Sequence, residues 1–205
     1  MISNILFDFD GVILNSMPFR EIGFRLIFKE FEKDKVDSLI EYHNQNGGLS
    51  RYNKINFFFE EILKVSIEKT EVDSYANSFS KIMKKELINK KYLVNETLVF
   101  LRKNFKRYNL HIVSGSDESE LQYLCKQLDI AKYFLSIYGS PMTKSFLVNK
   151  VISENNYLVN ETLLIGDSIN DLEAAAHNGI KFYGYNNLDL MSKSDVYLKD
   201  YMELT

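Results

Sequence analysis

An apolar run that stops at two aspartates begins the chain: Ile5-Leu6-Phe7-Asp8-Phe9-Asp10-Gly11-Val12. A buried parallel strand has such a continuous apolar run, and it ends where turn residues appear. In an open α/β sheet, ligands bind beyond the carboxyl ends of the strands. We therefore expect Asp8 at the end of the strand and Asp10 on the loop that follows, with both side chains facing a crevice.

Two carboxylates at this spacing repel each other, and burying them without a partner costs free energy. A hard divalent cation resolves the conflict, because Mg²⁺ favours oxygen ligands and few protein carboxylates. The pair Asp8 and Asp10 therefore predicts a Mg²⁺ site. Taken alone, an Asp-x-Asp-Gly run is more often a solvated turn than a catalytic site, so the interpretation depends on the rest of the chain.

Composition and charge narrow the class of protein. At 205 residues the chain can bury a sizeable core without disulfides, and its net charge of −3 argues against a dedicated nucleic-acid or membrane surface. The single Cys125 excludes an intrachain disulfide and a zinc site built from cysteines. Asp8 and Asp10 interrupt the first apolar run, so it does not have the pattern of a secretory signal peptide. No apolar stretch is long enough to span a bilayer. We therefore expect a cytoplasmic enzyme that binds neither nucleic acid nor membrane.

The pattern of residues 16–88 differs from that of the rest of the chain. This stretch is rich in Phe, Lys and Glu, and its apolar residues recur at helical spacing with no convincing strand. Asp34-Lys35 and Gly47-Gly48 are expected to separate helices, and four helices suggest a small bundle. Residues 1–15 and 89–205 alternate strand and helix patterns, which predicts a doubly wound parallel α/β sheet. We expect this α/β part to be the catalytic core and residues 16–88 to be a helical insertion.

Three later stretches place catalytic residue types directly after apolar strands or turns. They are Ile112-Val113-Ser114-Gly115-Ser116, Gly139-Ser140-Pro141-Met142-Thr143-Lys144 and Leu163-Leu164-Ile165-Gly166-Asp167-Ser168-Ile169-Asn170-Asp171. With the first stretch they give the order DxDG, Ser, Lys, GDxxxD, which resembles the haloacid dehalogenase-like (HAD) hydrolase superfamily over essentially the whole chain. The resemblance implies a Rossmann-like core with an inserted helical cap of the C1 type, as in phosphoglycolate phosphatases and β-phosphoglucomutases.

The resemblance assigns the chemistry to the two aspartates of the first stretch. The first Asp of DxDG accepts the phosphoryl group, so this role falls to Asp8, and the aspartyl-phosphate splits one difficult displacement into two easier steps. The second Asp, here Asp10, protonates the leaving oxygen and then activates water. An Asp at this second position is typical of phosphatases and phosphomutases, whereas dehalogenases and transport ATPases lack it.

Asp167 and Asp171 flank the start of the helix expected after the strand at residues 162–165. Their spacing places both carboxylates on one side of a starting helix, where each could also be a routine helix cap. The resemblance implies that Asp167 binds Mg²⁺ directly, and that Asp171 lies in the outer shell and orients water or the lysine. With Asp8 and Asp10 they complete the expected metal site.

Ser114, Gly115 and Lys144 are expected to hold the phosphoryl group. Ser114 is expected to end a strand, where its hydroxyl and the following N–H groups could cradle phosphate oxygens, although a simple Ser N-cap is equally compatible. Gly115 lets the backbone approach closely. The resemblance makes Lys144 the cation that neutralises charge on the transferring group, whereas a lone lysine would indicate little.

The segment at residues 42–54 is the expected specificity loop of the cap. It resembles the glycine-then-Ser-Arg segment of β-phosphoglucomutase-like caps. Arg51 could hold a carboxylate or a second phosphate bidentately, with Lys54 assisting. A capped helix with solvated basic residues is the alternative, and the residues alone leave both open.

The chain is therefore expected to be a Mg²⁺-dependent phosphatase that hydrolyses a small-metabolite phosphomonoester, such as a sugar phosphate, through an aspartyl-phosphate. Two alternatives remain. A phosphomutase would return the phosphoryl group to a sugar, and an idle binding module would keep the fold without turnover, which the four intact motifs disfavour. The physiological substrate and the oligomeric state do not follow from the sequence, because selectivity depends on the cap.

Overall fold

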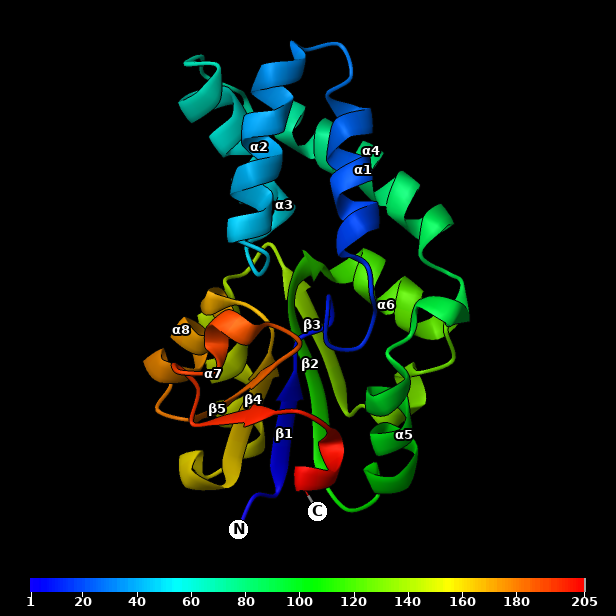
Figure 1. Ribbon diagram of the computed structural model, residues 1–205, viewed down its shortest axis with the longest axis vertical. Helices are drawn as coiled ribbons and strands as arrows, with labels where there is room; N and C mark the ends of the chain where they lie inside the picture. The colour runs from blue at the N-terminus through cyan, green and yellow to red at the C-terminus, as the bar shows by residue number, and fades with distance from the viewer. Residues whose placement is uncertain (205) are drawn as a thin grey trace.

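Six parallel strands form one sheet in the computed structural model, which describes residues 1–204 (Figure 1). Each neighbouring pair of strands is parallel, which confirms the expected doubly wound sheet. The strand order reverses between β1 and β4, and ligands bind at such a switch point. In spatial order the strands are β3 (Ser136–Ser140), β2 (Asn109–Asp117), β1 (Asn4–Phe7), β4 (Thr162–Gly166), β5 (Lys181–Tyr185) and β6 (Val196–Leu198).

Strand β1 lies in the middle of the sheet and is buried on both faces. Because side chains alternate along a strand, Ile5 and Phe7 join the apolar cluster on one face, and Leu6 joins the cluster on the other. Four helices cover these faces, and Figure 1 shows them in two pairs: α5 (Asn95–Asn104) with α6 (Glu118–Gln127), and α7 (Lys144–Asn155) with α8 (Ile169–His177).

Four further helices stand over the carboxyl end of the sheet, at the opposite end of the molecule from both termini (Figure 1). They are α1 (Met17–Ile27), α2 (Lys33–Gln45), α3 (Arg51–Phe57) and α4 (Lys69–Glu86), and a π-helical turn at Phe58–Ile62 continues α3. None of residues 17–86 belongs to a strand. Among the described residues, 1–204, no helix is both long and apolar enough to cross a membrane.

The two chain segments that join these helices to the sheet lie side by side. The Asn15 N–H donates to the Tyr92 carbonyl at 2.8 Å, and the Val94 N–H donates to the Ile13 carbonyl at 2.9 Å. Paired linkers of this kind form a compact hinge between an insertion and its host. We propose, as the sequence suggests, that residues 16–88 are a cap and that residues 1–15 and 89–205 are the core.

Two local expectations are wrong. Asp34-Lys35 does not break a helix: α2 begins at Lys33, and Asp34 lies in its first turn, where a carboxylate interacts favourably with the helix dipole. The chain turns instead between α1 and α2.

Strand β2 does not end at Ser114 but continues to Asp117, with a register shift against β3 between Val113 and Asp117. The small residues of this stretch let the strand bulge without breaking its pairing.

Aromatic side chains fill the interior of the cap. The buried Phe28 ring lies 4.3 Å from the Phe58 ring, 5.0 Å from the Tyr75 ring and 6.1 Å from the Phe59 ring, measured between centroids. Contacts between rings at such distances add to the stabilisation from apolar burial. The phenylalanines that enrich residues 16–88 therefore contribute to the core of the cap.

Phe28→Ala is expected to lower the free energy of unfolding by about 3–5 kcal/mol, because the lost ring leaves a cavity. Phe146→Ala is the matched control: its side chain is 53% exposed, and its loss should change stability by about 0.5 kcal/mol or less. Urea unfolding followed by circular dichroism measures both. Equal losses in the two variants would contradict the packing of the cap core.

Candidate functional site

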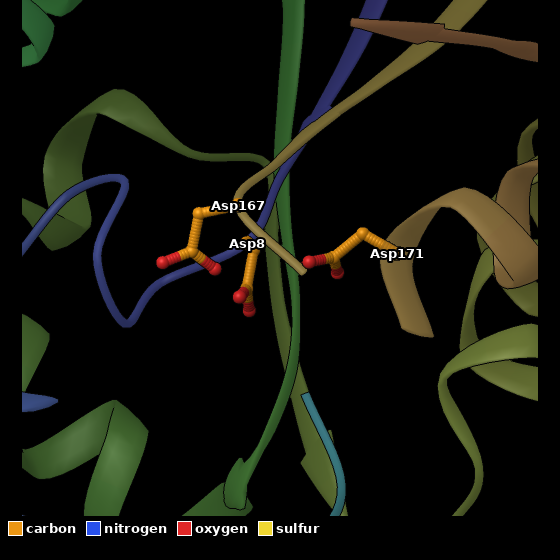
Figure 2. A group of neighbouring side chains, drawn as sticks. All are labelled: Asp8, Asp167 and Asp171. Atoms are coloured by element: carbon orange, nitrogen blue, oxygen red, sulfur yellow. The ribbon is translucent and has the colours of Figure 1, made fainter. Parts of the chain in front are cut away.

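Three carboxylates converge at the carboxyl edge of the sheet (Figure 2). Asp8 follows β1, Asp167 follows β4, and Asp171 lies in the first turn of α8. One oxygen of each lies within 4.8 Å of the others. The register of the sheet causes this approach, because Phe7 pairs with Ile165 and the two strands therefore end together. We call these three residues the acidic cluster.

Local structure fixes two members of the acidic cluster. Asp171 accepts hydrogen bonds from the Ser168 N–H at 3.0 Å and from the Ser168 hydroxyl at 2.6 Å, in a reciprocal cap of α8. Asp171 is therefore a helix-capping residue as well as a member of the cluster. Gly11 has φ +77°, and a Cβ atom there would lie 1.9 Å from Asp167 Oδ2. Only glycine lets this loop pass so close to the carboxylate.

Lys144 is the cation of the acidic cluster. It is the first residue of α7, and the Thr143 hydroxyl caps that helix by accepting from the Phe146 N–H at 3.3 Å. Its Nζ lies 3.0 Å from Asp8 Oδ1 and also donates to Asp171. Burial lowers the pKa of Lys144, but the attraction of Asp171 and Asp8 outweighs it and raises the pKa, so the ammonium stays charged.

One ammonium does not balance three carboxylates, of which Asp8 and Asp171 are buried and Asp167 is partly buried. Burial and repulsion from Asp171 raise the pKa of Asp8 to about 7, although Lys144 opposes this. Burial and repulsion from Asp8 and Asp171 likewise raise the pKa of Asp167 well above its usual value. An all-oxygen site with surplus negative charge fits Mg²⁺, since the cation favours oxygen ligands and stabilises both ionised groups. Asp8 and Asp167 are the residues placed to hold it, with Asp171 beside them.

Asp10 turns away from the acidic cluster and toward the cap. Its Oδ1 accepts from the Ser16 hydroxyl and from Arg20 Nε at 2.6 Å, and its Oδ2 accepts from the Ser116 hydroxyl at 2.6 Å. Burial raises the pKa of Asp10, but Arg20 and the two hydroxyls outweigh it and hold the pKa below its usual value. The Asp10 carboxylate lies outside the cluster, so its part in metal binding stays a prediction.

Ser114 and Gly115 lie on the bulged part of β2. The Ser114 hydroxyl is buried and accepts from the Ser116 N–H at 3.1 Å. At Gly115, a Cβ atom would lie 2.2 Å from the Gly48 carbonyl oxygen, which belongs to the cap loop. Gly115 is therefore one of the points at which the cap touches the core.

Arg51 and Lys54 are both buried, contrary to the alternative of a solvated basic helix. Arg51 Nη1 donates to Glu120 at 2.6 Å and to the Ser80 hydroxyl at 2.5 Å. Lys54 Nζ lies 2.8 Å from His43 Nδ1 and donates to the Gly47 carbonyl at 3.2 Å. Both side chains therefore point into the interior between cap and core.

Lys54 has no carboxylate within ion-pair distance among the described contacts. Burial, followed by the positive charge of Arg20, lowers the pKa of Lys54 to about 7. Burial and the neighbouring Lys54 and Arg20 lower the pKa of His43 to about 2, so that imidazole is neutral. The charge of Lys54 therefore changes near neutral pH.

A small cavity of about 20 Å³ lies between the cap and the core. Asp10, Gly115 and Ser116 line it from the core side, and cap side chains line it from above: Arg20, Phe24, His43, Arg51, Lys54 and Phe79. The structure thus brings the predicted Asp10, Gly115, Arg51 and Lys54 to one cavity. The predicted Asp8, Asp167, Asp171 and Lys144 meet in the adjoining acidic cluster.

Sequence reasoning missed several residues that hold this site together. Arg20 and Glu120 are buried charges on helices, and the signal for Arg20 was its place on the apolar face of α1 beside Phe24. Asn187 Nδ2 donates to the Asp167 carbonyl at 2.7 Å, and Asn186 Nδ2 donates to the Gly11 carbonyl at 2.9 Å. No local pattern marked these two amides, because their partners are distant in sequence.

The fold and the site together define an α/β protein with a helical insertion, an acidic cluster that could hold a metal ion and a buried lysine. The haloacid dehalogenase-like hydrolase family matches residues 5–185. The chain therefore belongs to this family, and the resemblance seen in the motifs is confirmed.

Two curated relatives and two solved structures are similar along nearly the whole chain. A phosphoglycolate phosphatase of Vibrio parahaemolyticus is 27% identical over 213 residues, covering 93% of this chain and 88% of that protein. A phosphorylated carbohydrates phosphatase of Thermotoga maritima is 24% identical over 189 residues, covering 88% of this chain and 83% of that protein. A mutant of CbbY from Rhodobacter sphaeroides in complex with xylulose-(1,5)bisphosphate superposes with a TM-score of 0.79 at 15% identity, covering 100% and 96%. YfnB from Bacillus subtilis bound to magnesium superposes with a TM-score of 0.71 at 17% identity, covering 100% of this chain and 97% of that chain. Both structures support the fold alone.

Lys54→Met is expected to stabilise the protein most near pH 7 and progressively less toward about pH 10. The unfolded chain keeps the Lys54 proton up to the ordinary pKa of 10.5, whereas the folded protein releases it above about 7. The folded state thus binds fewer protons in this window, and the stability of the unsubstituted protein rises with pH.

Thermal unfolding of both proteins across this pH range measures the difference. Lys69→Met is the matched control, because the Lys69 side chain is 88% exposed. A stability difference for Lys54→Met that does not depend on pH would show that Lys54 keeps an ordinary pKa in the folded protein.

Proposed function

We propose that the protein hydrolyses the phosphomonoester of a small polar metabolite, such as a sugar phosphate, with Mg²⁺ as cofactor. The observation that carries the proposal is the position of Lys144, with its Nζ 3.0 Å from an Asp8 oxygen inside the acidic cluster. A carboxylate flanked by a fixed cation and a cation site is suited to attack an anionic phosphoryl group. The phosphatase names of the two curated relatives support the same reaction.

In the first step, an Asp8 oxygen attacks phosphorus and the bond from phosphorus to the leaving oxygen breaks, which gives an aspartyl-phosphate. Asp10 supplies the proton that the leaving oxygen takes up. Because Arg20 holds the pKa of Asp10 low in this arrangement, Asp10 must take up that proton while its contact with Arg20 is broken. In the second step, Asp10 takes a proton from water, the water oxygen bonds to phosphorus, and the bond to Asp8 breaks to release phosphate. Lys144 and the Ser114 hydroxyl hold the phosphoryl oxygens, and bound Mg²⁺ would shield the negative charges that meet there.

The cap completes the site by excluding water and by holding the leaving group. The cavity beneath it is lined by Asp10 together with Arg51 and Lys54, so the acid–base group and the cap cations face the same space. A volume of about 20 Å³ accommodates roughly one water molecule and no metabolite. The cap must therefore move away from the core before a leaving group can occupy this cavity.

Asp8→Asn is expected to lower phosphate release from sugar phosphates and aryl phosphates to below about one thousandth of the unsubstituted rate, because an amide cannot accept the phosphoryl group. Removal of Mg²⁺ with EDTA should abolish release, and excess Mg²⁺ should restore it. Asp34→Asn, at an exposed position on α2, is the matched control.

Steady-state phosphate release measures these rates. Turnover by Asp8→Asn close to that of the control would exclude Asp8 as the nucleophile. Interconversion of glucose phosphate isomers without phosphate release would replace the phosphatase with a phosphomutase.

A further inference from the structure

The sheet joins the segments that carry Asp8 and Asp167 only as far as Asp8 itself. The Asp8 N–H donates to the Ile165 carbonyl at 2.9 Å, and the pairing of β1 with β4 ends there. Among the described residues, 1–204, no backbone hydrogen bond joins residues 9–12 to residues 167–170. The two neighbouring carboxylates repel each other (Figure 2). A further contact is therefore needed to hold the two loops together.

Two consecutive amides supply this contact from a third strand. Asn186 and Asn187 directly follow β5, which pairs with β4. Asn186 Nδ2 donates to the Gly11 carbonyl at 2.9 Å, and Asn187 Nδ2 donates to the Asp167 carbonyl at 2.7 Å. Two adjacent residues thus hold the loop after β1 and the loop after β4. We call Asn186 and Asn187 the amide clamp.

Local structure fixes both side chains of the amide clamp. Asn186 has φ +54°, a left-handed conformation that asparagine adopts more readily than most residues. The Asn187 Oδ1 accepts from the Asp189 N–H at 3.1 Å and so caps the short helical turn at Leu188–Leu190. The amide that donates to Asp167 is therefore anchored at its oxygen as well as at its nitrogen.

The two loops pass very close to each other at the residue that Asn186 holds. Gly11 has φ +77°, and a Cβ atom there would lie 1.9 Å from Asp167 Oδ2. Asp8 precedes Gly11 in the same segment of chain. A Gly11 loop released from Asn186 would be free to move away from the Asp167 carboxylate. The amide clamp therefore opposes the repulsion within the acidic cluster.

A fixed spacing of carboxylates favours a small cation. Mg²⁺ requires near-ideal octahedral geometry with bonds of about 2.0–2.1 Å, whereas Ca²⁺ accepts flexible geometry with bonds of about 2.3–2.6 Å. Lys144 ties Asp8 to Asp171, and the amide clamp ties Asp167 to the loop that follows Asp8. The chain itself thus sets the spacing of all three members of the acidic cluster.

We propose that Asn186 and Asn187 are positioning residues of the metal site, and that they make it selective for Mg²⁺ over the larger Ca²⁺. Each acts through the backbone of a loop rather than by binding the ion. The inference rests on the proposed Mg²⁺-dependent function. It goes beyond that function by assigning the choice of ion to two residues outside the acidic cluster.

Two substitutions remove the amides with little other change. Asn186→Gly keeps the left-handed backbone, which glycine adopts freely. Asn187→Ser keeps an oxygen that can cap the following turn, but its side chain is too short to keep the amide hydrogen bond. The matched controls make the same changes elsewhere. They are Asn156→Gly, at φ +55° after α7, and Asn109→Ser, which loses a 2.8 Å bond to Asn4 where β1 and β2 begin.

Metal binding by the full-length protein tests the amide clamp without turnover. Each protein is titrated with Mn²⁺ while electron paramagnetic resonance counts the free ion, and competition by Mg²⁺ and by Ca²⁺ gives both dissociation constants. Their ratio is the preference. Partial unfolding of a variant weakens both ions by the same factor, so it leaves the preference unchanged.

The unsubstituted protein and both controls are expected to bind Mg²⁺ at least about tenfold more tightly than Ca²⁺. Asn186→Gly and Asn187→Ser should each weaken Mg²⁺ about tenfold, because groups that orient metal ligands contribute this much to affinity. Ca²⁺, which tolerates a looser site, should weaken about threefold or less. Each variant of the amide clamp therefore loses much of the preference.

A preference near one in the unsubstituted protein, or one that persists in both variants of the amide clamp, overturns the proposal. Equal weakening of both ions, or the same loss of preference in the controls, overturns it as well and makes the asparagines structural supports only. A preference lost in one variant alone excludes the other asparagine.

The same proteins separate this proposal from the proposed function. Phosphate release by the unsubstituted protein, with an unchanged preference in both variants, removes the amide clamp and leaves the phosphatase. A preference that depends on Asn186 and Asn187, without hydrolysis of any ester, removes the phosphatase and leaves a selective metal site.

Discussion

Repulsion among three neighbouring carboxylates is the constraint on which the rest of this structure depends. The carboxylates of Asp8, Asp167 and Asp171 repel one another at their separations, and among the described residues Lys144 is the only cation paired with them. The parallel register of β1 and β4 and the left-handed backbone of Gly11 nevertheless hold the groups together. A fold that maintains an unfavourable arrangement so firmly does so at a functional site, where a further cation removes the conflict.

Asp10, the proposed acid–base residue, is connected to the cap rather than to the acidic cluster. Asp10 binds Ser16 and Arg20, and Arg20 in turn binds Glu120, which also holds Arg51. Any movement of the cap away from the core must break these buried contacts. Opening the cap therefore changes the surroundings of Asp10 and the arrangement of the arginines together. Opening of the cap and the hydrogen bonding of Asp10 are thus coupled through the same side chains.

Elements whose signal is local could be predicted from the sequence. The apolar run before Asp8 is β1, and the helical spacing within residues 16–88 corresponds to α1, α2, α3 and α4 with no strand. The acidic cluster also followed from sequence, because motifs that end neighbouring parallel strands must meet at one edge of the sheet.

What could not be predicted depends on contacts between distant segments. Glu120 binds cap residues 100 and 69 positions away, and nothing in its own helix marks it as buried. The direction of the Asp10 carboxylate was likewise hidden, because it is set by Arg20 and Ser116 rather than by its own loop. The expected break at Asp34-Lys35 failed for a local reason: acidic residues favour helix starts as well as turns.

The most direct test of the account is a crystal structure of the protein soaked with Mn²⁺, an anomalous scatterer that replaces Mg²⁺ at oxygen sites. The account predicts one anomalous peak bridging the carboxylates of Asp8 and Asp167, at about 2.0–2.2 Å from an oxygen of each. No peak at the acidic cluster in an otherwise well-occupied crystal, or a peak bound by other residues, would contradict the claim that a metal ion joins the two strands.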